Sequence, residues 1–129
     1  MICYAFRSVP GVCKIGSYIG NGNTDGPYIN TAFKPRWIIY RVIDSGTNAY
    51  SWTVVDTARS PTNGPNSMVL HPNLDSADSS GSGNTIDVLS DGWKRRDSHA
   101  SVNQSGKKYI YMAMAEIGGY GTLPPIYGR

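Results

Sequence analysis

The chain has 129 residues, a hydrophobic fraction of 40% and a formal net charge of +3. This length favours a single domain that can bury a sizeable core. No apolar run approaches the roughly 18 residues of a membrane helix, the first residues lack the basic and apolar regions of a signal peptide, and the charge is too small and too scattered for a nucleic-acid interface. We therefore expect neither a membrane nor a nucleic acid as a partner.

The chain begins with two segments that predict a β-hairpin. Residues 2–6 and 12–18 flank the turn-forming stretch 8–11, Ser-Val-Pro-Gly. In this hairpin Cys3 and Cys13 fall nearly opposite each other, so a cross-strand disulfide is geometrically possible, and two buried free thiols in a reducing compartment are the alternative. The spacing of the two cysteines does not match the paired ligands of a zinc site.

A second hairpin is predicted in the middle of the chain. β-branched and aromatic residues fill segments 36–43 and 49–55, which a Gly-containing loop, 44–48, connects. The following stretch, 60–85, is rich in Ser, Asn, Pro, Gly and Asp. We expect it to be a long surface excursion, anchored by the apolar residues 68–70 and by Leu74.

The last predicted strands lie in the C-terminal half. Asp91-Gly92 separates residues 86–89 from 93–96 and predicts a tight hairpin. Residues 109–117 are apolar at both alternating sets of positions, which is typical of an inner strand of a sandwich. Short strands with frequent turn signals and no clean helical period predict an all-β, single-domain antiparallel sandwich, jelly-roll-like in character.

Residues 118–129 follow the last predicted strand and contain four glycines and the pair Pro124-Pro125. Leu123, Ile126 and Tyr127 are apolar residues with no strand of their own. We therefore expect a β-sandwich domain over residues 1–117 and an extended arm over 118–129. The arm docks either on its own core or on a neighbouring subunit.

The residues that could carry catalysis show no catalytic pattern. His71 and His99 are 28 positions apart in loop sequence, and Glu116 is the single glutamate. A glycosidase needs two carboxylates facing each other across a cleft. Asp56 is predicted to pair with Arg59 or to lie near Glu116, and an ordinary ion pair or turn cap is the simpler interpretation. We predict that the chain is not an enzyme and has no catalytic residues.

No cofactor or metal site is predicted either. Residues 16–22 are glycine-rich, but they lack the Gly-Lys-Ser/Thr ending of a phosphate loop and lead into a strand, so they are interpreted as turns. Residues 75–78 offer too few ligands at the right spacing for a calcium loop.

Aromatic residues give the remaining signal. The chain has nine tyrosines and three tryptophans but two phenylalanines. Tyrosine combines a flat apolar face with a polar hydroxyl, which suits subunit interfaces and sugar stacking. The candidates for contacts with a partner or a glycan are the tyrosines in polar or Gly-rich surroundings and the apolar residues of the arm: Tyr18, Tyr28, Tyr120, Leu123, Ile126 and Tyr127.

A series of short motifs adds a family resemblance. The motifs are residues 16–22, 25–29, 31–37, 56–59, 86–94, 102–103 and 106–116. In this order they resemble a β-rich domain of unknown function that recurs in virion and tail-fibre-like proteins of bacteriophages, especially marine ones. The resemblance runs from about residue 3 to residue 117. Ala32 stands where that family usually has glycine.

This resemblance brings no catalytic residues and implies a virion structural protein. Relatives usually carry the domain at the end of a longer chain, whereas here Met1 lies almost at the first motif. We therefore expect a free-standing version located in the virion, a capsid decoration or a tail or fibre accessory subunit, which binds other virion proteins. We also expect a homo-oligomer, with a trimer as the working assumption. The alternative is a carbohydrate-binding module of a tail fibre that contacts host surface glycans.

Overall fold

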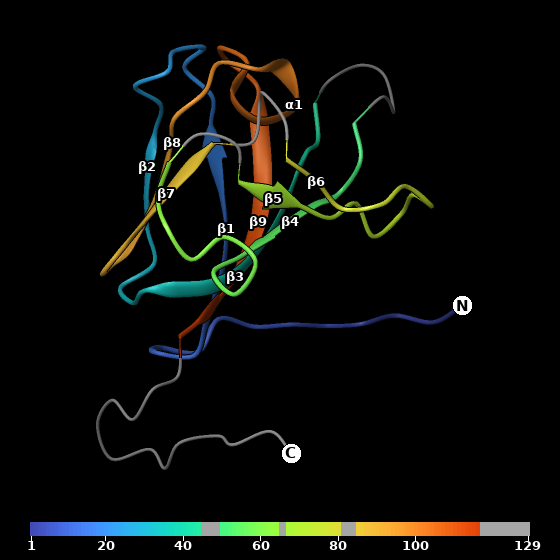
Figure 1. The fold of residues 1–129 in the computed structure, drawn as a ribbon. Helices are drawn as coiled ribbons and strands as arrows, with labels where there is room; N and C mark the ends of the chain where they lie inside the picture. Colours follow the sequence, from blue (N-terminus) through green and yellow to red (C-terminus); the bar gives the residue numbers. More distant parts are fainter. Residues whose placement is uncertain (45–49, 65–66, 81–84, 117–129) are drawn as a thin grey trace.

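The computed structural model describes residues 1–44, 50–64, 67–80 and 85–116. Within them the elements follow one another as β1 (Cys13–Ile19), β2 (Tyr28–Asn30), β3 (Pro35–Val42), β4 (Thr53–Asp56), β5 (Met68–Val69), β6 (Ser79–Ser80), β7 (Ile86–Leu89), β8 (Gly92–Arg95), α1 (Ala100–Asn103) and β9 (Lys108–Ala115). Figure 1 shows the resulting arrangement of antiparallel sheets with one short helix at their end.

The larger sheet has the strand order β1-β9-β3-β4, and we call it sheet A. β9 lies inside it, since β1 pairs with one edge of β9 and β3 pairs with the other. Tyr109, Tyr111, Ala113 and Ala115 of β9 are all buried. The predicted inner strand is therefore confirmed as far as Ala115.

The smaller sheet, sheet B, has the order β2-β8-β7. β7 and β8 form the predicted hairpin, with Leu89 opposite Gly92. The turn consists of Ser90 and Asp91, so Gly92 belongs to the strand rather than to the turn. Position 92 requires glycine because a Cβ there would clash with two groups of the neighbouring strand β2, the Ile29 carbonyl oxygen and the Tyr28 ring.

The hairpin predicted from residues 36–43 and 49–55 is also confirmed. β3 pairs with β4 so that Ile38 lies opposite Val55 and Tyr40 opposite Thr53. Residues 45–49 of the predicted loop lie outside the described residues. β4 is shorter than expected and begins at Thr53.

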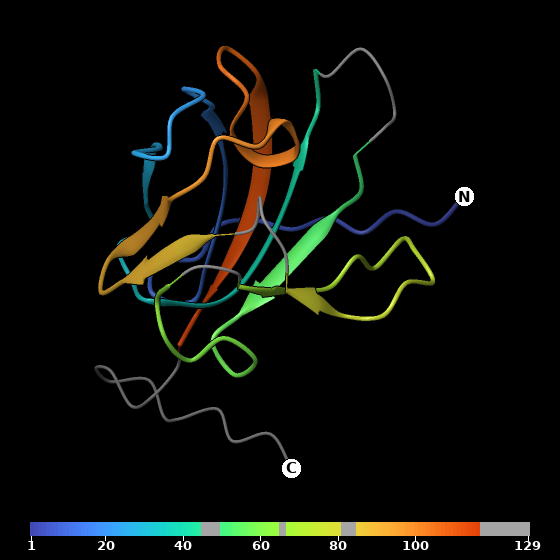
Figure 2. The same ribbon diagram turned by 45° about the horizontal axis from the view of Figure 1, so that its top comes forward.

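The excursion after β4 contains a small sheet of its own, in which β5 pairs with β6. Val69 is fully buried and anchors it, and the backbones of Val54 and Leu70 exchange two hydrogen bonds of 2.8 and 3.0 Å. Leu74 is exposed, so that predicted anchor is wrong. The chain beyond β5 projects away from β7 and β8 in both views (Figure 1 and Figure 2).

The core lies between sheets A and B and is organised around Trp93 of β8. Its ring meets those of Tyr18, Tyr40 and Tyr111 from sheet A at centroid distances of 5.4, 6.2 and 5.9 Å. Arg95, two residues further along β8, is also fully buried, and its guanidinium lies 3.9 Å from the ring centre of Tyr40. Two antiparallel sheets packed on this shared core confirm the predicted all-β sandwich.

The N-terminal hairpin is the main departure from the sequence prediction. Val9 and Cys13 form a single bridge, and residues 2–6 pair with no described strand. The Ser8 hydroxyl accepts a hydrogen bond of 3.0 Å from the Ile15 N–H, which is the place that the Arg7 carbonyl would take in a longer hairpin. Residues 1–7 therefore run away from the sandwich (Figure 1). Cys3 is exposed, Cys13 is half-buried, and both are free thiols.

Candidate functional site

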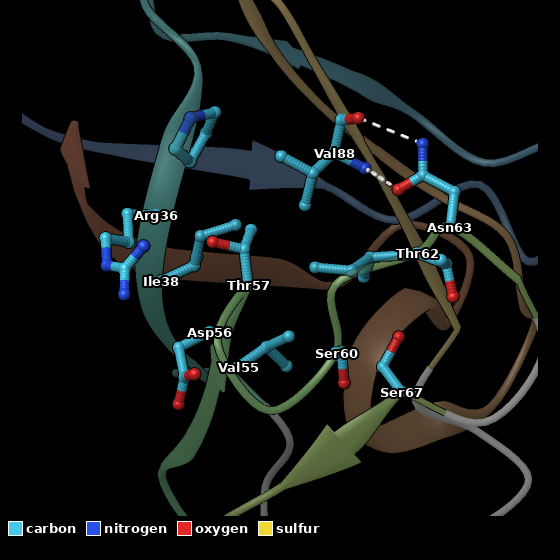
Figure 3. A pocket seen from close by; sticks show the side chains of 12 residues that line it. Arg36, Ile38, Val55, Asp56, Thr57, Ser60, Thr62, Asn63, Ser67 and Val88 are labelled. Atoms are coloured by element: carbon cyan, nitrogen blue, oxygen red, sulfur yellow. Dashed lines mark hydrogen bonds between the residues drawn. The ribbon is translucent and has the colours of Figure 1, made fainter. Parts of the chain in front are cut away.

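A small hollow lies between β3, β4, β7 and the loop after β4 (Figure 3). It has room for about one water molecule. On one side the amide of Asn63 donates to the Val88 carbonyl at 3.0 Å and accepts from the Val88 N–H at 2.7 Å. This side chain fastens the loop to the outer edge of β7. The hollow is thus a seam between elements rather than a substrate pocket.

Asp56, at the rim of this hollow, has a structural role. Its carboxylate accepts hydrogen bonds from the backbone N–H groups of Ala58 and Arg59, at 3.0 and 2.9 Å, and pairs with the Arg59 guanidinium. Burial alone would raise the pKa of Asp56, but these Arg59 and Ala58 contacts outweigh it and lower the pKa. Arg59 also pairs with Asp78 at 2.6 Å. The predicted Asp56–Arg59 ion pair is confirmed, and it ties both ends of the excursion to β4.

The other residues weighed for catalysis also have structural partners. Glu116 pairs with Lys34 at 2.6 Å, so it does not face Asp56. His71 contacts the Trp52 carbonyl through Nδ1 at 3.0 Å, and the ring of His99 caps the start of α1 by accepting from the Ser101 N–H. Within the described residues, no three His, Cys, Asp or Glu side chains gather closely enough to hold a metal ion. No helix described here is long and apolar enough to span a membrane.

The prediction that the glycine-rich stretch 16–22 forms turns is wrong for its first half, because residues 16–19 belong to β1 and only 20–22 leave the strand. These last residues pack against the loop that follows α1. A Cβ on Gly20 would collide with the backbone of Gln104. Asn103 is fully buried beside it and accepts from the Asn21 N–H at 2.9 Å. The Asn103 amide also donates to the carbonyls of Asn23 and Asp97, at 2.7 and 2.8 Å. The stretch is therefore held by side-chain and backbone packing.

Tyr18 is not available to a partner, contrary to the prediction. Its side chain is 7% exposed, stacks on Tyr109 at a centroid distance of 4.8 Å and donates a hydrogen bond of 2.8 Å to the Val102 carbonyl. Burial raises its pKa well above the usual value of 10. The missing side chain of Gly16 leaves the space beside Tyr18 that the Tyr111 ring occupies. Gly-rich surroundings here mean close packing rather than exposure.

Tyr28, in contrast, lies on the outer face of sheet B and is 43% exposed. Its ring lies over Gly92, where a Cβ would come within 2.9 Å of the Tyr28 hydroxyl oxygen. Lys94 stands opposite Tyr28 in the register and pairs with Asp25 at 2.6 Å. Partial desolvation and then the neighbouring Asp91 carboxylate raise the pKa of Tyr28. An accessible aromatic ring thus lies among paired charges and polar groups.

The outer face of sheet A is apolar across three strands. The register aligns Ile15 of β1, Met112 of β9 and Ile39 of β3 in one row. Met114 lies in the next row, and Ile110 lies on the other side of Met112. We call this surface the apolar face: Ile15, Ile19, Ile39, Ile110, Met112 and Met114. Ile15, Ile19 and Met114 are exposed and the others are half-buried.

Residues 1–7, which we call the N-terminal segment, form a second exposed apolar feature. Ile2, Tyr4 and Phe6 are 80%, 79% and 66% exposed, at alternating positions of an extended chain. This segment and the end of β9 leave the sandwich at the same end, because the Ala115 N–H donates to the Val12 carbonyl at 2.8 Å.

The family described as Domain of unknown function (DUF7483) matches residues 1–117. The chain belongs to this family. No curated protein and no solved structure matches it. The DUF7483 match ends one residue after Glu116, the last described residue, so the family domain contains the whole described sandwich.

The remaining candidates from the sequence, Tyr120, Leu123, Ile126 and Tyr127, lie outside the described residues, as does the predicted arm. Sequence reasoning did not single out the apolar face of this DUF7483 domain. A signal was present, since Ile15 and Ile19 alternate with Gly16 and Tyr18, and the second apolar set of β9 must point away from the core. Two neighbouring strands with an apolar outer set indicate a shared exposed face.

Proposed function

We propose that this chain is a structural subunit of a bacteriophage virion, a capsid decoration or a tail or fibre accessory protein, which acts through protein–protein contacts. The apolar face of sheet A carries this proposal. The solvent side of an antiparallel sheet is normally polar, and large exposed apolar patches mark interaction sites. The motif resemblance to phage virion proteins suggests that the partner proteins belong to a virion. We take the assembly to be a homo-oligomer, with a trimer as the working assumption.

The partners of the candidate catalytic groups support a non-enzymatic role. Asp56 is held by Arg59, Glu116 by Lys34, and His71 by a backbone carbonyl. In the part of the chain that the structure describes, the hollow that Asp56 borders has room for about one water molecule. The chemistry that the described surface offers is burial of apolar area, which is what subunit association needs.

Mass spectrometry of purified particles tests the virion proposal. Particles of a phage that encodes this chain are expected to contain it in a fixed ratio to the major capsid protein. Substitution of two exposed residues of the apolar face, Ile15→Lys with Met114→Lys, is expected to lower that ratio at least tenfold. The matched control is Ser76→Lys, an exposed position on the excursion. A chain that is expressed during infection but absent from particles would overturn the proposal.

The second candidate function is glycan binding at Tyr28. The observation in its favour is the exposed ring over Gly92 beside the Lys94–Asp25 pair, which offers stacking together with hydrogen-bond donors and acceptors. In a glycan array followed by titration of the best binder, Tyr28→Ala is expected to weaken binding at least tenfold. Tyr28→Phe keeps the ring and is expected to retain most of the affinity. Equal binding by all three proteins would exclude this site.

A further inference from the structure

Open strand edges are sites where another chain can add, and the described part of this fold closes most of them. The outer edge of β4 is met by the backbone of Leu70. The outer edge of β7 is met by the Asn63 amide, which bonds both backbone groups of Val88. At β2, the Lys14 ammonium donates to the Asn30 carbonyl at 2.9 Å. Each closure uses a specific contact from elsewhere in the chain.

The outer edge of β1 is different. β1 pairs with β9 alone among the described strands. The Ile15 N–H points away from β9, because it donates to the Ser8 hydroxyl. Alternate residues of a strand direct their backbone groups to the same edge, so Ser17 and Ile19 also present theirs outward. Both residues are exposed, and no described strand pairs with this part of the edge.

The N-terminal segment has the properties of a strand that lacks a sheet. Its backbone is drawn out away from the sandwich (Figure 1), and its apolar side chains Ile2, Tyr4 and Phe6 alternate with Cys3 and Ala5. Period-two alternation suits one buried and one open face. Yet all three apolar side chains are strongly exposed. Such a row of side chains gains most by adding to a sheet edge, where backbone hydrogen bonds and apolar burial form together.

We propose that the N-terminal segment of one copy adds as an antiparallel strand to the outer edge of β1 of a second copy, a contact that rests on the proposed assembly role. The chain's own segment is diverted from this edge, because the Ser8 hydroxyl holds the Ile15 N–H and ends the hairpin after the Val9–Cys13 bridge. Exchange of an identical element between copies needs only a hinge, and residues 8–11 supply one.

The parity of the two strands supports this pairing. If the exchanged segment keeps the register that the Val9–Cys13 bridge sets within one chain, Ala5 lies opposite Ser17 and Tyr4 opposite Tyr18 of the second copy. Ile2, Tyr4 and Phe6 then share the side of the sheet that carries Tyr18, the core side. The Ser17 N–H donates to the Ala5 carbonyl in this arrangement. The apolar set of the segment therefore extends the inner face of sheet A.

The test measures the solution mass of the full chain by light scattering over a concentration series. Ser17→Pro removes the outward N–H, while the contacts of β1 with β9 use the backbone of Lys14, Gly16 and Tyr18. It is expected to weaken self-association at least tenfold, and Ser17→Thr, the matched control, is expected to leave it unchanged. Tyr4→Asp with Phe6→Asp changes exposed residues alone and is expected to weaken association equally.

Mixing the two kinds of variant gives the decisive result. Ser17→Pro retains the segment and the Tyr4/Phe6 variant retains the edge, so the mixture is expected to form a one-to-one heterodimer in native mass spectrometry. A monomeric wild-type chain, or variants that associate as the wild type does, would overturn the proposal. If the chain is monomeric yet present in particles, the strand exchange fails and the virion role stands. If the chain exchanges strands but is absent from particles, the strand exchange stands and the virion role fails.

Discussion

Ala32 is strained at its backbone. It has a φ of +63°, and it is the one non-glycine residue with positive φ in the part of the chain that the structure describes. The left-handed region costs an L-residue with a Cβ about 1 kcal/mol. Its N–H is held by the Asp91 carbonyl at 3.0 Å and by the Asn30 side chain at 2.9 Å, so the conformation is imposed by neighbours.

We therefore expect Ala32→Gly to stabilise the fold by about 0.5–1 kcal/mol, since glycine adopts this φ without steric strain. Chemical denaturation of the two proteins measures the difference. The control is Ala100→Gly in α1, where the backbone is helical and the same change is expected to destabilise by up to about 1 kcal/mol. A destabilising Ala32→Gly would contradict the strain argument.

Individual residues also show where sequence reasoning fails. Tyr18 and Tyr28 both stand near glycines, and the sequence predicts the same exposure for both. Gly16 makes room for the Tyr111 ring beside the buried Tyr18, whereas the exposed ring of Tyr28 lies against Gly92. Whether a glycine exposes or buries its neighbour depends on the strand that packs against it. That strand is distant in sequence, so the pattern alone cannot decide.

Among the elements, the loop between β1 and β2 depends on one side chain. Asn103, at the end of α1, satisfies the Asn21 N–H and the Asn23 carbonyl from a fully buried position. Asn103→Ala leaves these groups without a partner, and we expect a loss of about 3 kcal/mol in the free energy of unfolding. Gln104→Ala, at the next and exposed position, is the matched control. Hydrogen exchange should rise at Asn21 in the first variant alone.

The elements that sequence predicted well are local ones. The β7–β8 hairpin joins its strands through a two-residue turn, and β-branched and aromatic residues flank the longer β3–β4 loop on both sides, so both pairings follow from nearby sequence signals. The N-terminal hairpin is equally local in sequence, but its prediction is wrong. The Ser8 hydroxyl accepts the Ile15 N–H in place of the Arg7 carbonyl. Nine residues with few apolar side chains, 70–78, separate β5 from β6, and no pattern indicated their pairing. Competition by a side chain and sparse hydrophobic signals limit such predictions.

At the scale of the whole molecule, the two sheets share a core rich in tyrosine, and this gives the fold an alkaline limit. Burial raises the pKa of Tyr18, Tyr109 and Tyr111 above the usual value of 10. In the unfolded chain these hydroxyls ionise near pH 10, while in the folded chain they keep their protons. The unfolded state then binds fewer protons, so the free energy of unfolding falls as pH rises above 10. Below pH 10 these three tyrosines add no pH dependence to the free energy of unfolding.

For one such group the expected slope is about −1.4 kcal/mol per pH unit between pH 10 and the folded pKa. Denaturation midpoints measured at several pH values across this range test it. Tyr18→Phe costs the hydrogen bond to Val102, about 1 kcal/mol at neutral pH, but it should make the alkaline slope shallower by about 1.4 kcal/mol per pH unit. Tyr4→Phe, at a strongly exposed position, should change neither quantity. Equal slopes in the wild type and Tyr18→Phe would mean that Tyr18 ionises in the folded sandwich, against its burial between Trp93 and Tyr109.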